Sequence, residues 1–138
     1  FGLAGMRIGM AFADEEMIAG IMKVKDSYNV NRLSLLAATA ALDDLPWMTR
    51  NAQRIQRSRK KLSAGLARLG YQVYPSQANF VLARRNGENI RSVYEELKRR
   101  KIYVRYFDLP GLQDCLRITV GTPSEIKIFL KEMATLTH

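Results

Sequence analysis

Three arginines stand apart from the basic helices that hold most of the positive charge of the chain: Arg7, Arg105 and Arg117. Arg7 follows a glycine-rich turn, whereas Arg105 and Arg117 lie within apolar stretches typical of strands. An arginine in such a stretch is unfavourable unless its guanidinium meets an anion, and its planar shape matches phosphate and carboxylate. Each arginine alone is also compatible with a structural ion pair to one of the 13 acidic residues. Together, the three indicate a site for a small polyanionic ligand.

The sequence contains few residues suited to a hydrolytic triad, a metal site or a nucleotide-binding loop. The single histidine, His138, is the last residue, so a Ser-His-Asp arrangement would have to use the chain terminus. The single Cys115 allows neither an internal disulfide nor a Cys/His zinc site. The glycines of residues 2–9 match neither the dinucleotide fingerprint nor the P-loop, and Asp43 and Asp44 point in different directions on a helix. We therefore predict no metal site and no hydrolytic triad.

The net charge of +9 concentrates in two runs, residues 50–61 and 98–101. Beside the first run, apolar residues recur at helical spacing and form one stripe: Ile55, Leu62, Leu66 and Leu69. Proteins that bind nucleic acids usually interleave basic groups with aromatic residues or glycine-rich loops, and neither run does so. Solvated helix faces are therefore favoured, and a module that binds nucleic acid or an anionic surface stays open as the alternative. No apolar run reaches the roughly 20 residues of a membrane helix, and one cysteine suits a reducing cytoplasm.

The first half of the chain reads as one strand followed by helices. The stretch 7–13 predicts a short buried strand. Asp14 and Asn31 are placed to cap the helices that begin after them. Pro46 marks a turn or kink, and a long helix should then run almost to Gly70, a residue that favours helix ends.

After Gly70 the pattern changes to short strands and short helices. Strands are predicted over residues 71–75, 79–84, 102–107 and 115–120, with a helix over 90–97 between the second and the third. Thr122, Pro123 and Glu125 form a capping box at the start of a final helix. The order, long helices and then β-β-α-β-β-α, predicts an α+β layer of helices on a small sheet.

Five stretches occur in an order that resembles one enzyme family: FGLAGMRIG, YNVN, ANFVL, RYF and CLRITVGTPSE. Together they resemble the C-terminal part of the histidinol-phosphate aminotransferases, fold-type I enzymes of the α/β class that use pyridoxal 5'-phosphate (PLP). The resemblance implies that residues 1–30 form the tail of the large PLP-binding domain with a bridging helix, and that residues 31–138 form the small α+β domain. It also implies that the PLP-binding lysine lies just upstream of Phe1, so we expect no catalytic residue within the chain.

The resemblance implies roles only where the motifs match. Arg7 corresponds to the arginine that binds the phosphate of PLP, and a glycine-rich turn would let a phosphate approach the backbone. Arg105 and Arg117 correspond to two arginines that bind the anionic end of the substrate, either a phosphate or a carboxylate. Asn79 is interpreted as structural, and the segment 28–29 is expected to border the site.

The implied reaction interconverts histidinol phosphate and 2-oxoglutarate with imidazole-acetol phosphate and glutamate. The resemblance also implies a cytoplasmic homodimer, without nucleic-acid or membrane partners. Another PLP-dependent aminotransferase, a threonine-phosphate decarboxylase and a folded core without activity stay open as alternatives. We expect the 138 residues alone to bind PLP poorly and not to transaminate. Apolar surface that an adjoining domain would cover then favours non-native association.

Overall fold

The computed structural model describes residues 1–136, and the chain divides into two compact units between Arg50 and Asn51. The long helix α3 (Leu45–Arg68) carries the chain from the first unit into the second. The predicted boundary at residue 30 concerns the domains of a complete enzyme and stays a prediction. His138, set aside in the sequence analysis, lies outside the described residues.

The first unit consists of helices joined by irregular segments: η1 (Ala4–Met6), α1 (Glu15–Val24), α2 (Arg32–Asp43) and the start of α3. The two predicted caps are confirmed, because Asp14 and Asn31 each accept a hydrogen bond from the backbone N–H three residues later, at 2.8 and 2.9 Å. Asp44 separates α2 from α3. Pro46 lies in the first turn of α3, where a missing N–H loses no helical hydrogen bond.

The predicted strand over 7–13 is wrong. This segment is irregular and mostly exposed, with the Phe12 side chain 90% exposed. A strand needs a neighbouring strand to exchange backbone hydrogen bonds with it. In the part of the chain that the structure describes, the sheet contains only strands from the second unit. The apolar composition of 7–13 therefore indicates a segment suited to burial. Composition alone does not make it a strand, because a strand also needs a neighbouring strand.

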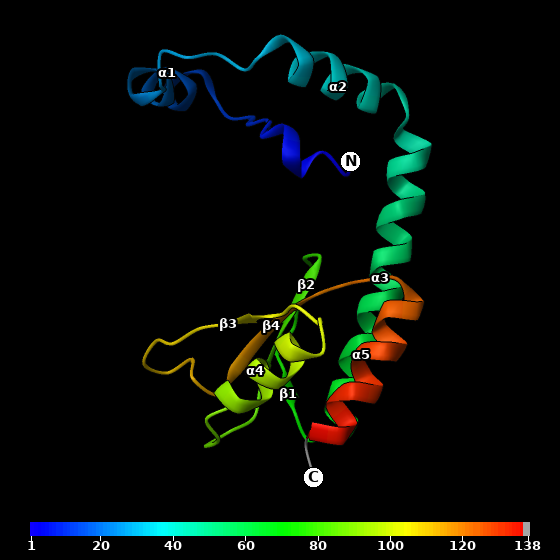
Figure 1. Ribbon diagram of the computed structural model, residues 1–138. Coiled ribbons are helices and arrows are strands. Elements are labelled where there is room, and N and C mark those ends of the chain that lie inside the picture. The colour runs from blue at the N-terminus through cyan, green and yellow to red at the C-terminus, as the bar shows by residue number, and fades with distance from the viewer. Residues whose placement is uncertain (137–138) are drawn as a thin grey trace. The chain divides into compact units, whose positions relative to one another are not determined.

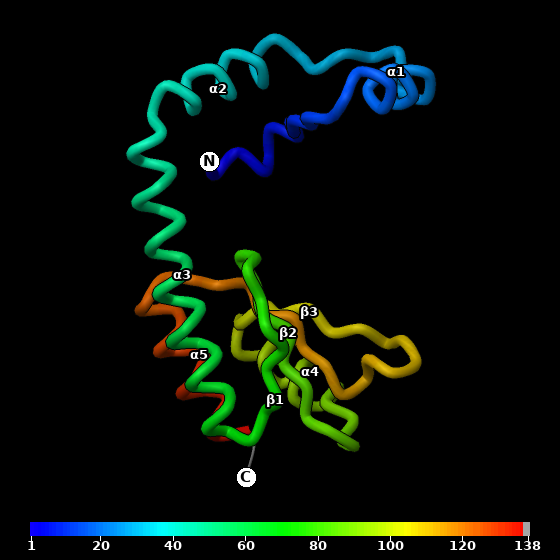
Figure 2. Tube along the Cα trace, turned by 180° about the vertical axis from the view of Figure 1, so that it is seen from behind, coloured from blue at the N-terminus to red at the C-terminus, as the bar shows by residue number. Residues whose placement is uncertain are grey.

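The second unit contains an antiparallel sheet with the strand order β1-β2-β4-β3, seen from opposite sides in Figures 1 and 2. Its strands are β1 (Gln72–Val73), β2 (Phe80–Arg84), β3 (Arg105–Tyr106) and β4 (Cys115–Thr119). Helix α4 (Arg91–Arg99) joins β2 to β3, and helix α5 (Pro123–Leu136) follows β4. The predicted β-β-α-β-β-α order is confirmed, although β1 and β3 are shorter than expected.

Alternate residues of the two central strands point to opposite faces of the sheet. On one face, Val81 of β2 and Ile118 of β4 face each other in the ladder and are buried. Helices α3, α4 and α5 add their apolar faces to the same core: Leu62, Leu66, Leu97, Ile126, Phe129 and Met133. On the opposite face, Arg117 is exposed. The helices therefore cover one face of the sheet and leave the other open.

Helix α5 begins with the predicted capping box. The Thr122 N–H donates to Glu125 Oε2 at 2.7 Å, and the Glu125 N–H donates to Thr122 Oγ1 at 3.3 Å. The backbone and hydroxyl donors of Thr122 hold the pKa of Glu125 below its ordinary value. The hydrogen bonds between Thr122 and Glu125 therefore fix the residue at which α5 begins after β4.

Helices α3 and α5 lie side by side (Figure 1), and they approach closely at Gly65. A Cβ atom at Gly65 would lie 2.8 Å from Leu130 Cδ2 and still closer to Leu130 Cδ1. A methyl group here would force the Leu130 side chain to move, so packing against α5 favours glycine, although alanine in a helix interior is favoured over glycine by about 1 kcal/mol.

We expect the substitution Gly65→Ala to lower the free energy of unfolding by about 1–3 kcal/mol, because the added methyl group overpacks the contact with Leu130. Urea denaturation measures this change. The double variant Gly65→Ala, Leu130→Ala serves as the control, because the shortened Leu130 side chain makes room for the new methyl group. A more stable Gly65→Ala protein would contradict the close approach of the two helices.

Candidate functional site

Arg105 and Arg117 lie directly opposite each other in the ladder between β3 and β4. Both side chains are exposed on the open face of the sheet, since the β4 neighbours of Arg117, Leu116 and Ile118, are buried on the other face. Residues opposite each other on one face of an antiparallel pair have Cβ atoms about 4.5–5.5 Å apart. The register thus brings together two arginines from different segments. Their role as substrate ligands stays a prediction.

Two phenylalanine rings lie beside these guanidinium groups. The ring centroid of Phe107 is 5.6 Å from the guanidinium carbon of Arg105 and 5.9 Å from that of Arg117. The ring of Phe80, from β2, lies 5.3 Å from the guanidinium carbon of Arg117. All three distances fall within the range of cation–π attraction. Sequence reasoning missed both rings; the position of Phe107, two residues after Arg105, was the available signal, because alternate residues of a strand share a face.

Neither arginine of the pair has an acidic partner within residues 1–136. The ion pairs found there use other basic residues: Arg84, Arg85, Arg91, Arg99 and Arg100. Like charges directly opposite each other in a sheet are destabilising, and no acidic side chain among the described residues offsets the repulsion between Arg105 and Arg117. An anion with two or more charges would relieve it.

Arg7, in the first unit, follows the short helix η1 and has a left-handed backbone conformation, with φ of 53°. Such a conformation is strained for a residue other than glycine. The turn is tied to α2, because the hydroxyl of the buried Ser34 donates a hydrogen bond to the Met6 carbonyl at 2.8 Å. The Arg7 side chain is exposed and forms no ion pair among the described residues. A strained backbone position that presents a free cation is typical of functional sites.

The remaining residues singled out in the sequence contribute little chemistry. The Asn79 backbone carbonyl accepts a hydrogen bond from the Val120 N–H at 2.8 Å, and the structural role of its side chain stays a prediction. Tyr28 is 86% exposed, and the Asn29 side chain accepts a hydrogen bond from Lys25. Burial raises the pKa of the Cys115 thiol, which makes it a poor nucleophile.

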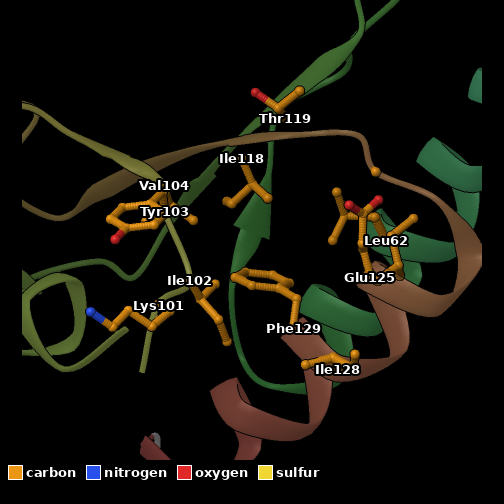
Figure 3. A pocket seen from close by; sticks show the side chains of 12 residues that line it. Leu62, Lys101, Ile102, Tyr103, Val104, Ile118, Thr119, Glu125, Ile128 and Phe129 are labelled. Atoms are coloured by element: carbon orange, nitrogen blue, oxygen red, sulfur yellow. The ribbon is translucent and has the colours of Figure 1, made fainter. Parts of the chain in front are cut away.

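A cavity of about 330 Å³ lies between the segment 101–104 and helix α5 (Figure 3). Its wall is mainly apolar, with Ile118 and Phe129 facing the same space (Figure 3), and Glu125 of the capping box also lines it. None of the three candidate arginines lines this cavity, so it is separate from the candidate anion site.

Within the described chain, no cluster of His, Cys, Asp and Glu side chains has the arrangement of a metal site. The helices of residues 1–136 include none that is both long and apolar enough to cross a bilayer.

A model of the family described as aminotransferase class I and II matches residues 1–133. The chain belongs to this aminotransferase family. It is 40% identical over 136 residues to histidinol-phosphate aminotransferase 1 of Nostoc sp., with 99% of this chain covered. It is 44% identical over 140 residues to histidinol-phosphate aminotransferase of Roseiflexus castenholzii, with 96% covered. The chain spans 38% of the length of each of these relatives.

The fold also matches solved aminotransferase structures. Histidinol-phosphate aminotransferase from Sinorhizobium meliloti, solved in complex with pyridoxal-5'-phosphate, has a TM-score of 0.84 and 25% identity, and the match covers 99% of this chain and 38% of that one. The resemblance to histidinol-phosphate aminotransferases seen in the sequence motifs is therefore confirmed. The α/β fold class of a fold-type I aminotransferase is confirmed with it.

We expect the substitution Arg105→Gln to be about 0.5 kcal/mol more favourable to stability at low than at high ionic strength, because it removes one of two like charges in direct opposition. The cation–π contact with Phe107 that is also lost contributes at both ionic strengths. The difference arises because salt screens the repulsion. Urea unfolding at two salt concentrations measures this difference. Arg100→Gln is the matched control: it breaks ion pairs with Glu96 and Glu132 and should not stabilise. A stability difference between Arg105→Gln and the wild-type chain that does not change with salt would contradict the repulsion.

Proposed function

We propose that the chain forms the substrate-binding part of a PLP-dependent aminotransferase that interconverts histidinol phosphate and 2-oxoglutarate with imidazole-acetol phosphate and glutamate. The observation that carries the proposal is the direct opposition of Arg105 and Arg117, without acidic partners among residues 1–136, on the open face of the sheet. The similarity to histidinol-phosphate aminotransferases, at 40 and 44% identity, supports this substrate over other amino donors.

The two arginines bind the anionic end of each substrate. A phosphate monoester carries close to two negative charges at neutral pH, so it can accept hydrogen bonds from both guanidinium groups. Glutamate and 2-oxoglutarate each have two carboxylate groups; each group carries one charge, and one such group fits one planar guanidinium. Holding this end orients the rest of the molecule, which is a positioning contribution to catalysis.

Arg7 binds the phosphate of PLP. Arg7 is exposed and lies between Gly5 and Gly9, which leave open space beside the backbone, since a Cβ atom at either position would meet nothing within 4 Å. An unpaired cation beside an open backbone fits a phosphate group. When bound, PLP supplies the electron sink that transamination needs. We also propose that the protein acts as a cytoplasmic homodimer, as the family resemblance implies.

Arg117→Ala tests the proposal in the natural gene product that contains these residues. We expect kcat/KM for histidinol phosphate to fall by about 100-fold or more, because the substrate loses its orientation as well as an ionic contact. Steady-state transamination kinetics measure the fall. Arg117→Lys should recover only part of the activity, because lysine keeps the charge without the planar pair of donors.

Arg57→Ala is the matched control for Arg117→Ala. Arg57 lies in the basic run of α3, is exposed, and has no ion pair among the described residues. Its removal should leave the kinetics unchanged. Wild-type kinetics in Arg117→Ala, or a salt-dependent binding of DNA that depends on Arg57, would instead favour the nucleic-acid module considered in the sequence analysis.

Arg7→Gly tests cofactor binding by a route that does not depend on turnover. Glycine suits the left-handed backbone at this position, so the fold should keep its stability. The affinity for PLP should fall by about 10- to 100-fold, because a charge-assisted hydrogen bond is lost. Titration of PLP absorbance measures the affinity. Unchanged PLP affinity in Arg7→Gly would show that this arginine does not hold the cofactor.

A further inference from the structure

The guanidinium groups of Arg105 and Arg117 repel each other, and yet both lie against the same aromatic ring. The centroid of Phe107 is within 6 Å of each guanidinium carbon, at 5.6 and 5.9 Å. Exposed arginine side chains are otherwise free to turn away from each other into solvent, since they have many rotamers. A ring that attracts both cations opposes that separation.

We propose that Phe107 is a positioning residue that holds Arg105 and Arg117 side by side and thereby makes the pair selective for a doubly charged phosphate over a singly charged carboxylate. This inference rests on the proposed function of the two arginines. It adds a physical reason why the site formed by Arg105 and Arg117 prefers a phosphate to a carboxylate.

The selectivity follows from how many arginines each ligand needs. A phosphate dianion gains most when two guanidinium groups are already close together, because the binding energy is then not used to bring two like charges into proximity. A carboxylate is satisfied by one guanidinium in a bidentate contact. Loss of the shared ring therefore weakens binding of phosphate esters more than binding of carboxylates.

The ring of Phe80 contacts only one of the two arginines, so its removal can be compared with removal of the Phe107 ring. Its ring lies 5.3 Å from the guanidinium carbon of Arg117, and the described residues include no cation–π contact between Phe80 and Arg105. Removal of the Phe80 ring loosens one arginine, whereas removal of the Phe107 ring loosens both. The effect of Phe80→Leu should therefore be smaller than that of Phe107→Leu.

The experiment compares Phe107→Leu, Phe107→Tyr, Phe80→Leu and Tyr103→Leu in the natural gene product, with separate KM values for histidinol phosphate and for glutamate. We expect Phe107→Leu to raise the KM for histidinol phosphate about tenfold, as the loss of two cation–π contacts predicts. The KM for glutamate should rise less than about twofold, because the carboxylate group that binds at this site needs only one guanidinium group. Phe107→Tyr keeps the ring and should restore the KM for the phosphate substrate.

Tyr103→Leu is the matched control, because Tyr103 precedes Arg105 by two residues, is 74% exposed, and has no ring contact with either arginine among the described residues. Equal changes in both KM values for Phe107→Leu, or changes no larger than those of Tyr103→Leu, would refute the positioning role. If Phe107→Leu does not fold, the smaller, phosphate-selective effect of Phe80→Leu decides the same question. Failure of Arg117→Ala to alter either KM would instead refute the proposed function itself.

Discussion

The ladder between β2 and β4 determines what each face of the second unit carries. It runs from the pair Phe80 and Thr119 to the pair Arg84 and Cys115, and it places Val81 opposite Ile118 within the core. A shift of one residue in an antiparallel ladder moves every side chain to the other face. In this unit such a shift would bury Arg117 and expose Ile118. The apolar face under the helices therefore selects the register, and the register in turn puts arginine on the open face.

The open face carries two like charges in direct opposition, which is the feature on which the proposed anion site depends. Two arginines in direct opposition weaken the folded state when no anion is present, and none of the acidic side chains described pairs with them. Elsewhere in the same unit, Arg100 pairs with both Glu96 and Glu132. The pair of Arg105 and Arg117 differs from Arg100 because its two cations lie directly opposite each other without such carboxylates.

The short edge strand β3 is suited to carry half of this site. It consists of Arg105 and Tyr106, and its two side chains have different tasks. Tyr106 stacks on Tyr94 of α4 with ring centroids 5.5 Å apart, which anchors the strand to the helical layer. Arg105 points to the open face and meets the ring of Phe107. One residue thus fixes the position of the strand, while its neighbour lies exposed on the open face.

The sequence by itself determined the elements whose signals are local. The helix caps at Asp14, Asn31 and Thr122 depend on hydrogen bonds that span three residues, so their residue types are sufficient to place them. The order of strands and helices after Gly70 followed in the same way from apolar spacing. The motifs likewise identified the aminotransferase family.

Only the tertiary structure decided the features that depend on a distant partner. The segment 7–13 has the composition of a strand and is not one, because its hydrogen bonds would need a neighbour that the described chain does not provide. The close contact at Gly65 comes from Leu130 of another helix. The shared ring of Phe107 depends on the β3–β4 register. Such contacts join residues far apart in the chain, and spacing within a single segment carries no information about them.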